Sequence, residues 1–260
     1  MHGNLKSTWR PSPPPVCRDD CSICQGTGWE LFSEPGISLA RPCSCRTLDR
    51  IIRMRDRARI PQRYEHCTLD NYVPLNFSQT RALAETRRLL ARYPAPGRDL
   101  FFAGGPGVGK THLATAAIRE LMPRLAEDAL FVDFHDIVQS DGQGISGAGL
   151  GREDWDRLGH CPMLVLDNFG VTTPTSEGID QVMRLLRCRW RLRRPTIYTG
   201  ERVRLGLLTS GANGETCSST QAFLLALPPV FLLTFVAQVK FLSLVGEDYR
   251  RKDSTVPELF

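Results

Sequence analysis

One short stretch of the chain combines the residue types that bind the phosphates of a nucleotide. It reads Gly104, Gly105, Pro106, Gly107, Val108, Gly109, Lys110 and Thr111, with His112 next. Such glycines let backbone N–H groups close around a β-phosphate, while the Lys110 amine reaches the β- and γ-phosphates and the Thr111 hydroxyl ligates Mg²⁺. We therefore expect residues 104–112 to bind ATP. The His112 side chain is more typical of packing than of catalysis.

The acid that would complete a magnesium site ends an apolar run later in the chain. Residues 163–166 are all apolar and are followed by Asp167. This pattern is typical of the Walker B motif, in which a buried parallel strand carries an aspartate at its C-terminal end, toward the metal. Asp167 is thus the expected partner of Thr111 at Mg²⁺. The candidates for a role in ATP hydrolysis are Lys110, Asp167 and the next residue, Asn168.

Five of the nine cysteines lie between residues 17 and 45. Cys21 and Cys24 form a Cys-x-x-Cys pair, and Cys43 and Cys45 form a Cys-x-Cys pair. Zinc takes four thiolates in a tetrahedron, and a Cys-x-x-Cys turn supplies two of them. We expect these four residues to hold Zn²⁺, with Cys17 as the spare, and a four-thiolate site is structural because it leaves no open position for chemistry. Unligated thiols are the alternative.

Arginines are concentrated directly after this cluster. Arg46, Arg50, Arg53 and Arg57 fall at spacings of 4, 3 and 4 residues, which places them on one stripe of a helix that Pro61 ends. The stripe could contact phosphates or an acidic partner protein, or it could be a solvated helix face.

The elements that must position these residues follow from apolar runs and helical periodicity. The phosphate-binding residues lie between a short apolar strand and a helix, which is the context such a loop requires. The expected strands are 100–103, 129–134, 163–167 and 195–199, and the expected helices are 79–93, 112–119 and 177–192. This alternation predicts an α/β fold, a three-layer P-loop domain with a mainly parallel sheet.

Composition favours a soluble globular protein with unevenly distributed charge. The chain has 260 residues, of which 42% are hydrophobic and 23% charged, and a net charge of +5, which excludes wholesale disorder and collagen-like sequence. Residues 1–98 carry 16 basic and nine acidic side chains, a net charge of +7, and residues 99–260 carry 17 and 19, a net charge of −2. The odd number of cysteines and the polar, proline-rich first residues predict a cytoplasmic protein without a secretory signal.

These features divide the sequence into four expected parts. They are a flexible tail at 1–16, a small zinc-binding N-terminal module with the basic helix at 17–63, a linker at 64–78 and the P-loop ATPase domain at 79–260. Because the ATPase domain has little net charge, any DNA binding by it would depend on local patches.

The order of the motifs resembles a known family. Cys-x-x-Cys-x-Gly-Thr-Gly and Cys-x-Cys are followed by Ile60-Pro-x-Arg63, the phosphate-binding loop with Lys-Thr-His, Leu-Val-Leu-Asp-Asn-Phe-Gly170 and Gly246-Glu-Asp-Tyr-Arg250. This series resembles the DnaC/DnaI-type replicative helicase loaders, whose AAA+ domain is shared with the IstB-type transposition helper ATPases. The resemblance implies an ATP-dependent factor in DNA replication that binds the replicative DNA helicase through its N-terminal region. It also implies single-stranded DNA binding by the AAA+ domain, and self-association in the ATP state.

The chain departs from the family pattern at the catalytic end of the site. The family usually has a second acid after the Walker B aspartate, where this chain has Asn168, and an amide cannot accept a proton as a carboxylate does, so hydrolysis should be slow. The family's polar sensor aligns with Glu201, whose carboxylate would repel a γ-phosphate.

No residue matches the arginine that reaches a neighbouring subunit's nucleotide, although Arg202 or Arg204 could act in its place. Arg189 matches a family arginine that could face a phosphate or DNA, or form a structural ion pair.

A long uncharged stretch replaces the segment that would carry that intersubunit arginine. Residues 217–239 contain no charged residue. Three interpretations are open: a buried or partner-facing segment, a membrane helix, which Pro228 and Pro229 disfavour, and a locally altered reading frame.

The leading hypothesis is a AAA+ helicase loader or closely related accessory ATPase, with ATP, Mg²⁺ and Zn²⁺ as cofactors and no membrane association. Two other functions stay open. An IstB-like transposition helper would keep the fold, although the simpler helpers typically lack a zinc unit. A hydrolysis-deficient, nucleotide-gated adaptor would explain Asn168, Glu201 and the missing arginine.

Overall fold

The computed structural model describes residues 21–34, 37–95, 97–138, 152–210 and 217–248. The chain forms two compact units, Met1–Arg53 and Met54–Phe260. The division falls within helix α1 (Ser44–Arg57), whereas the sequence suggested a boundary after residue 63. Cys17 lies outside the described residues.

The first unit contains a β-hairpin that the sequence did not predict. β1 (Trp29–Glu34) and β2 (Ile37–Pro42) pair antiparallel. Glu30 and Arg41 are directly opposite each other, and their side chains form an ion pair with hydrogen bonds of 2.8 and 2.9 Å. The hairpin connects the two cysteine pairs, and α1 begins directly after it.

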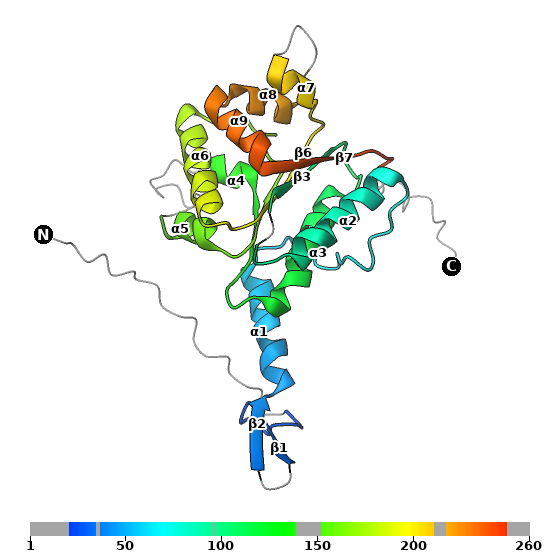
Figure 1. Ribbon diagram of the computed structural model, residues 1–260, viewed down its shortest axis with the longest axis vertical. Coiled ribbons are helices and arrows are strands. Elements are labelled where there is room, and N and C mark those ends of the chain that lie inside the picture. Colours follow the sequence, from blue (N-terminus) through cyan, green and yellow to red (C-terminus); the bar gives the residue numbers. More distant parts are fainter. Residues whose placement is uncertain (1–20, 35–36, 96, 139–151, 211–216, 249–260) are drawn as a thin grey trace, which may run out of the picture. The chain divides into compact units, whose positions relative to one another are not determined.

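The second unit contains a five-stranded parallel sheet. Its strands are β3 (Asp99–Gly104), β4 (Leu130–Asp133), β5 (Leu164–Asp167), β6 (Thr196–Gly200) and β7 (Val239–Leu244), in the order β4-β5-β6-β3-β7 (Figure 1). Each neighbouring pair is parallel. The first four strands confirm the predicted apolar runs, and β7, which pairs with β3, was not predicted. The carboxyl ends of the strands therefore meet at one edge of the sheet, where ligands bind in α/β folds.

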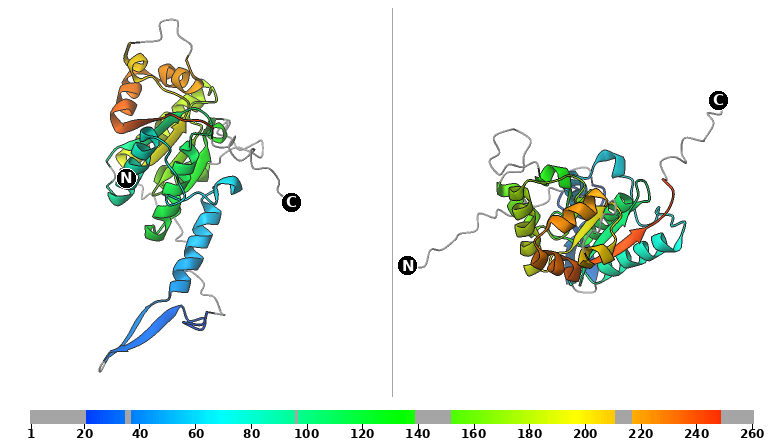
Figure 2. Two further views of the ribbon diagram at one scale, coloured as in Figure 1. Left: turned by 90° about the vertical axis from the view of Figure 1, so that its right-hand side faces the viewer. Right: turned by 90° about the horizontal axis from the view of Figure 1, so that it is seen from above.

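Helices cover both faces of this sheet (Figure 2), which confirms the predicted three-layer α/β architecture. One face packs against α2 (Phe77–Ala91) and α3 (Lys110–Leu121). The other packs against α4 (Phe134–Val138), α5 (Arg152–His160), α6 (Ser176–Arg191), α8 (Ser219–Ala226) and α9 (Pro229–Gln238). The remaining helical segments are α7 (Leu205–Ser210) and the short turns Gln62–Tyr64 and Met122–Arg124.

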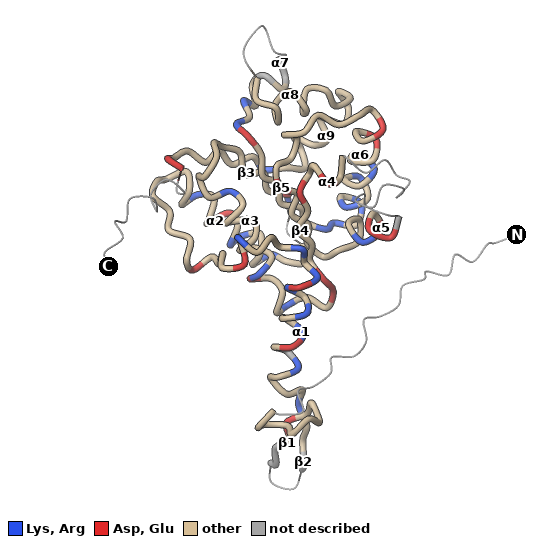
Figure 3. The backbone as a smooth tube through the Cα atoms, turned by 180° about the vertical axis from the view of Figure 1, so that it is seen from behind, with Lys and Arg blue, Asp and Glu red and all other residues tan. Residues whose placement is uncertain are grey.

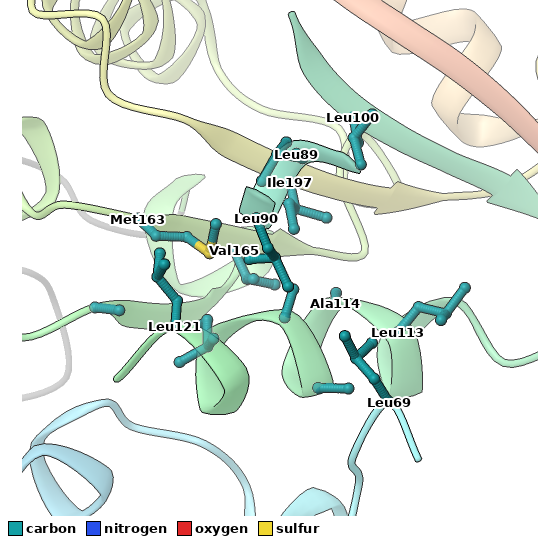
Figure 4. Close-up of a cluster of buried hydrophobic side chains, with 14 of the residues drawn as sticks. Leu69, Leu89, Leu90, Leu100, Leu113, Ala114, Leu121, Met163, Val165 and Ile197 are labelled. Carbon is teal, nitrogen blue, oxygen red and sulfur yellow. The ribbon is translucent and has the colours of Figure 1, made fainter. Parts of the chain in front are cut away.

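Aliphatic side chains fill the core between α3 and the sheet. Leu113, Ala114 and Leu121 of α3 are fully buried against a cluster that includes Val165 of β5 and Ile197 of β6 (Figure 4). This packing holds α3 on the sheet, and its N-terminus therefore has a fixed position beside the ends of β3 and β5.

The uncharged stretch forms α8 and α9, which belong to the core on the opposite face. Phe231 and Phe235 are buried, and Phe235 stacks on Phe169 with ring centroids 5.7 Å apart. Figure 3 shows α8 and α9 free of charged residues, and Val230 and Leu233 are exposed on α9. Within the described ranges, no helix is long and apolar enough to cross a membrane. The stretch is therefore a packing element of the second unit.

A buried arginine connects the helices of that face to the sheet. Arg189 is 0% exposed, and its guanidinium donates hydrogen bonds of 2.6–3.1 Å to the carbonyl oxygens of Leu158, Cys161 and Pro195 and to Thr196 Oγ1. An arginine with this set of buried acceptors is structural, so Arg189 does not face a phosphate or DNA.

A buried carboxylate at the start of β3 lies in the same interior. Asp99 accepts hydrogen bonds from Thr196 N at 2.9 Å, Trp190 Nε1 at 3.1 Å and Tyr198 Oη at 3.3 Å. Burial raises the pKa of Asp99 to about 6, although these donors and the nearby Arg189 act in the opposite direction. The folded state therefore holds the Asp99 proton more tightly than the unfolded chain does.

Replacing Asp99 with asparagine should remove one pH dependence of stability. The pKa of Asp99 is about 6 in the folded protein, because burial raises it from its ordinary value of 3.8, so the folded state binds more protons than the unfolded state between those values. The free energy of unfolding contributed by Asp99 should thus fall by up to roughly 3 kcal/mol as the pH rises from about 4 to about 6. Urea unfolding of both proteins across this range measures the effect.

The wild-type free energy of unfolding minus that of Asp99→Asn should decline through this window and be constant above it. A difference that does not change with pH would contradict the buried environment assigned to Asp99. Asp180→Asn is the matched control, because it makes the same chemical change at an aspartate that is exposed on α6.

Candidate nucleotide site and cysteine cluster

The predicted phosphate-binding residues lie at the carboxyl edge of the sheet. β3 ends at Gly104 and α3 begins at Lys110, so the loop connects a buried strand to a helix N-terminus. Gly107 (φ +68°) and Gly109 (φ +93°) adopt left-handed conformations, which residues with a Cβ disfavour. The loop and the first turn of α3 thus combine backbone N–H donors with the positive end of a helix dipole.

Two side chains from distant parts of the chain approach this loop. A Cβ added at Gly109 would collide with the ring of Tyr72, and one added at Gly107 would collide with the carboxylate of Asp248. Tyr72 precedes α2 and Asp248 follows β7, so neither has a local sequence signal that links it to the loop. Neither residue was expected at the site from the sequence.

The Lys110 amine lies within its own loop. Its Nζ donates to Gly105 O at 2.6 Å and to Gly104 O at 3.1 Å. Both acceptors are neutral carbonyl oxygens, and an anionic phosphate is a stronger acceptor for an ammonium group. A bound phosphate would therefore compete successfully for this amine.

Thr111 and Asp167 come together as the sequence predicted. Thr111 Oγ1 donates to Asp167 Oδ1 at 2.9 Å, and Thr199 Oγ1 donates to the same oxygen at 2.5 Å. Asp167 is 2% exposed, and this burial raises its pKa against the effect of the two threonine hydrogen bonds. A buried carboxylate of this kind is strongly stabilised in its charged form by a nearby cation.

The donor atoms at this position fit magnesium. Mg²⁺ prefers oxygen ligands, keeps several waters and is usually bound through one or two carboxylates together with phosphates. Thr111 and Asp167 would hold the ion, which would neutralise charge on the β- and γ-phosphates.

Asn168 lies beside Asp167, but its amide contacts the neighbouring strand. Its φ angle is +56°, its N–H donates to Thr199 Oγ1 at 3.0 Å, and its Nδ2 donates to Asp133 Oδ2 at 2.7 Å. Asp133 ends β4 directly opposite Asp167 in the parallel register. The site therefore contains a second carboxylate that was not predicted from the sequence, although an acid near the end of the expected strand 129–134 was a signal for it.

The structure corrects the assignment of the polar residue on β6. The family pattern placed its polar sensor residue at Glu201. The Glu201 carboxylate, however, accepts a hydrogen bond from Ser219 N at 2.8 Å, and the Glu201 N–H donates to Thr220 Oγ1 at 2.9 Å. Glu201 is thus engaged at the first turn of α8. Thr199 is the β6 residue that contacts Asp167, because its position in the strand faces the same side of the sheet.

The His112 side chain contacts the segment before α2. Its Nε2 lies 3.0 Å from Thr68 O and 2.9 Å from Asn71 Oδ1, and its ring packs edge-on against Tyr72 at 5.2 Å. Burial lowers the pKa of His112, which favours the neutral form of the ring. These contacts attach to α3 a segment that the sequence suggested was a linker.

The four predicted zinc ligands converge in the first unit. The Sγ atoms of Cys21, Cys24, Cys43 and Cys45 lie within 4.8 Å of one another, with Cys21 and Cys43 at 3.8 Å and Cys24 and Cys45 at 3.6 Å. Zn–S bonds of about 2.3 Å place the sulfurs of a tetrahedron about 3.8 Å apart. The cluster therefore has the dimensions of a four-thiolate zinc site.

The backbone around the cluster forms the turns that such a site needs. Gln25 N donates to Cys21 O at 2.8 Å, and Gln25 and Gly26 both have positive φ angles. Cys43 N donates to Gly28 O at 2.9 Å, which fixes the second cysteine pair beside the first. These hydrogen bonds are local or join the two ends of the hairpin. The convergence of the four cysteines could therefore be predicted from their spacing in the sequence.

The arginine-rich stretch is divided between the two units. Arg57 pairs with Asp128 at 2.9 Å, and Arg59 pairs with Asp154 at 2.6 Å. Both acids belong to the second unit, so these two arginines make contacts within it. In the first unit, the guanidinium of Arg46 lies 5.2 Å from the centre of the Trp29 ring.

Comparison of the sequence with known proteins gives a clear relative. The chain is 27% identical over 142 residues to the replicative helicase loader DnaC of Escherichia coli (strain K12), an alignment that covers 54% of this chain and 58% of that protein. The chain thus spans little more than half the length of this relative. No protein-family model matches the chain.

Solved structures show the same likeness. A crystal structure of the DnaC helicase loader matches with a TM-score of 0.57 and 24% identity over 71% of this chain and 100% of that chain. A crystal structure of DnaI matches with a TM-score of 0.55 and 20% identity over 73% and 94% of the two chains. The second unit therefore has the AAA+ P-loop fold, and the resemblance to DnaC-like loaders found in the sequence is confirmed.

Proposed function

We propose that this chain is an ATP-binding AAA+ helicase loader, or a closely related accessory ATPase, in DNA replication. The observation that carries the proposal is the meeting of the loop 104–111 with the Thr111–Asp167 pair at the carboxyl edge of the parallel sheet. A backbone cradle, a lysine and an oxygen-lined metal position are the parts that bind a nucleoside triphosphate. The similarity to DnaC supports DNA replication as the setting.

The first unit is the proposed zinc-bound contact for the replicative helicase. Apart from its cysteines, it exposes apolar side chains, with Leu31 78%, Leu48 60% and Ile23 54% exposed. Exposed apolar groups on so small a unit are typical of a surface that binds another protein. Single-stranded DNA binding and self-association in the ATP state are assigned to the AAA+ unit.

Co-purification with the replicative DNA helicase tests this function. Deleting residues 1–43 should abolish capture of the helicase, because it removes the hairpin and three of the four clustered cysteines. The deletion must end before α1, since Met54 and Ala58 are buried in the AAA+ core and Phe131 N donates to Ala58 O at 2.8 Å. The truncated protein should still bind ATP and unfold at a similar temperature, which is the control for its folding.

Capture of the helicase by the truncated protein would contradict the role of the first unit. Failure of the full-length protein to capture the helicase, with ATP binding intact, would contradict the loader function itself.

Asn168 favours a second candidate function, a nucleotide-gated adaptor that binds ATP without hydrolysing it. An amide at this position cannot accept a proton from water. Tight ATP binding with no turnover, in the presence and absence of single-stranded DNA, would select the adaptor.

A further inference from the structure

The carboxylate that is missing at residue 168, directly after β5, has a counterpart on the adjacent strand β4. Asp133 ends β4, Asp167 ends β5, and the two residues are direct partners in the parallel register. Phe131 and Val165, two residues earlier on each strand, belong to the core under α3. Because side chains alternate along a strand, both carboxylates lie on the face of the sheet that α3 covers, which is the face of the phosphate-binding loop.

Asn168 holds this carboxylate close to the position of the missing acid. Asp133 Oδ2 lies 2.7 Å from Asn168 Nδ2, and Nδ2 occupies the place that a carboxylate oxygen of an aspartate at residue 168 would take. The Asp133 carboxylate therefore lies one hydrogen-bond length from the position that a carboxylate at residue 168 would take. The second oxygen, Asp133 Oδ1, accepts a hydrogen bond from His135 N at 2.9 Å.

The amide of Asn168 is itself held in place. Its backbone has φ +56°, a conformation that asparagine tolerates better than most residues. Its N–H donates to Thr199 Oγ1, and Thr199 Oγ1 in turn donates to Asp167 Oδ1. A chain of hydrogen bonds therefore links Asp133, Asn168, Thr199 and the carboxylate expected at magnesium.

A cavity borders both of these residues, Asp133 and Asp167. It has a volume of about 120 Å³, and its lining includes Asp133, Asp167 and Arg63. A water molecule occupies about 30 Å³ of liquid and needs two or more polar partners. The cavity thus has room for water beside Asp133.

We propose that Asp133 orients the attacking water in ATP hydrolysis, and that Asn168 is the positioning residue that holds its carboxylate. The proposal rests on the ATP-binding function proposed above and goes beyond it, because it makes this chain an active ATPase rather than an adaptor.

The reaction step places Asp133 against the nucleophile. The water oxygen forms a bond to the γ-phosphorus while the bond from that phosphorus to the β–γ bridging oxygen breaks, and ADP leaves with the electron pair. One proton of the water, held in a hydrogen bond to the Asp133 carboxylate, passes to solvent or to a phosphate oxygen, and the other stays on the new phosphate. A side chain that takes part in proton transfer contributes typically 10²–10⁴-fold to the rate, and we expect an orienting carboxylate to contribute at the lower end, about 100-fold.

Exchanging the two side chains tests the proposal. Asp133→Asn keeps an oxygen that accepts from His135 N, and the Asn168 amide can rotate to present its oxygen, so the fold should be retained. We expect about a 100-fold loss of kcat for phosphate release, with the Kd for Mg²⁺–ATP, measured by fluorescent ATP analogue, nearly unchanged. The double variant Asp133→Asn, Asn168→Asp places the carboxylate at residue 168 instead and should regain most of the turnover. Asp180→Asn, an exposed carboxylate on α6, should hydrolyse ATP at the wild-type rate.

Each other outcome overturns the proposal. If Asp133→Asn hydrolyses ATP at the wild-type rate, Asp133 has no role in the reaction. If Asp133→Asn loses turnover and the double variant does not regain it, the role of Asp133 is structural. A wild-type protein that binds ATP but releases no phosphate, with or without single-stranded DNA, would overturn the proposal and leave ATP binding intact. A wild-type protein that does not bind ATP would instead overturn the proposed function.

Discussion

Removing the metal from the cysteine cluster should unfold the first unit and leave the AAA+ unit folded. Among the described residues of that unit, the buried hydrophobic ones are Cys24, Cys43 and Cys45, so the hairpin has no apolar core of its own. A two-stranded hairpin is at best marginally stable in water, whereas a structural zinc contributes about 10–16 kcal/mol to folding in zinc-finger peptides. Cys43→Ser, which removes a fully buried ligand, should have the same effect as a chelator.

Zinc content, hydrogen exchange and limited proteolysis measure this effect. We expect the purified protein to hold zinc at one ion per chain. Chelation or Cys43→Ser should release it, abolish amide protection in β1 and β2, and expose residues 21–43 to protease. Protection in β3 and α3 should be unchanged. Cys217→Ser, in the second unit, is the matched control and should keep its zinc. A hairpin that stays protected without zinc would contradict a structural metal site.

Replacing Lys110 with alanine should remove most of the affinity for ATP. The amine is the charged donor of the loop, and a hydrogen bond to a charged group contributes about 1.5–3 kcal/mol, or roughly 10- to 150-fold in Kd. In the free protein its acceptors are Gly104 O and Gly105 O, which are neutral and partly accessible. The substitution should therefore weaken ATP binding far more than it changes the stability of the free protein.

Titration with Mg²⁺–ATP, followed by calorimetry and by the shift in unfolding temperature, measures this loss. A ligand that binds the folded state stabilises it in proportion to the logarithm of its concentration over Kd, so at the same concentration ATP should raise the unfolding temperature of the wild type much more than that of Lys110→Ala. Lys240→Ala is the matched control, because it also removes a lysine amine. Lys240 lies on β7 and forms an ion pair at 2.8 Å with Glu85 of α2. Wild-type affinity in Lys110→Ala would exclude the loop as the nucleotide site.

Spacing in the sequence predicted the parts of both sites that depend on neighbouring residues. A glycine-rich loop between a strand and a helix needs only local conformational freedom, so residues 104–111 could be recognised directly. The Cys-x-x-Cys turn is equally local. Apolar runs likewise predicted β3, β4, β5 and β6, because a strand buried on both faces must be apolar along its length.

Long-range pairing decided the rest. β7 contains a lysine, so it does not read as a continuous apolar run. It pairs with β3, while the strand before it in the chain, β6, lies on the other side of β3, and no local pattern indicates this connection. The same holds for Arg189, whose acceptors come from α5 and the start of β6 and make it structural. The family pattern placed the polar sensor at Glu201, whereas the strand register brings Thr199 into contact with Asp167.

The sequence by itself predicted a phosphate-binding loop, a metal-side aspartate and a four-cysteine cluster, because each depends on neighbouring residues. It also showed an amide, Asn168, where hydrolysis needs a carboxylate. Only the tertiary structure placed Asp133 against that amide, because the adjacency of β4 and β5 is a property of the sheet order. Local sequence specifies the elements and their loops, but side chains from separate strands meet only through the hydrogen-bonded register that the folded sheet imposes.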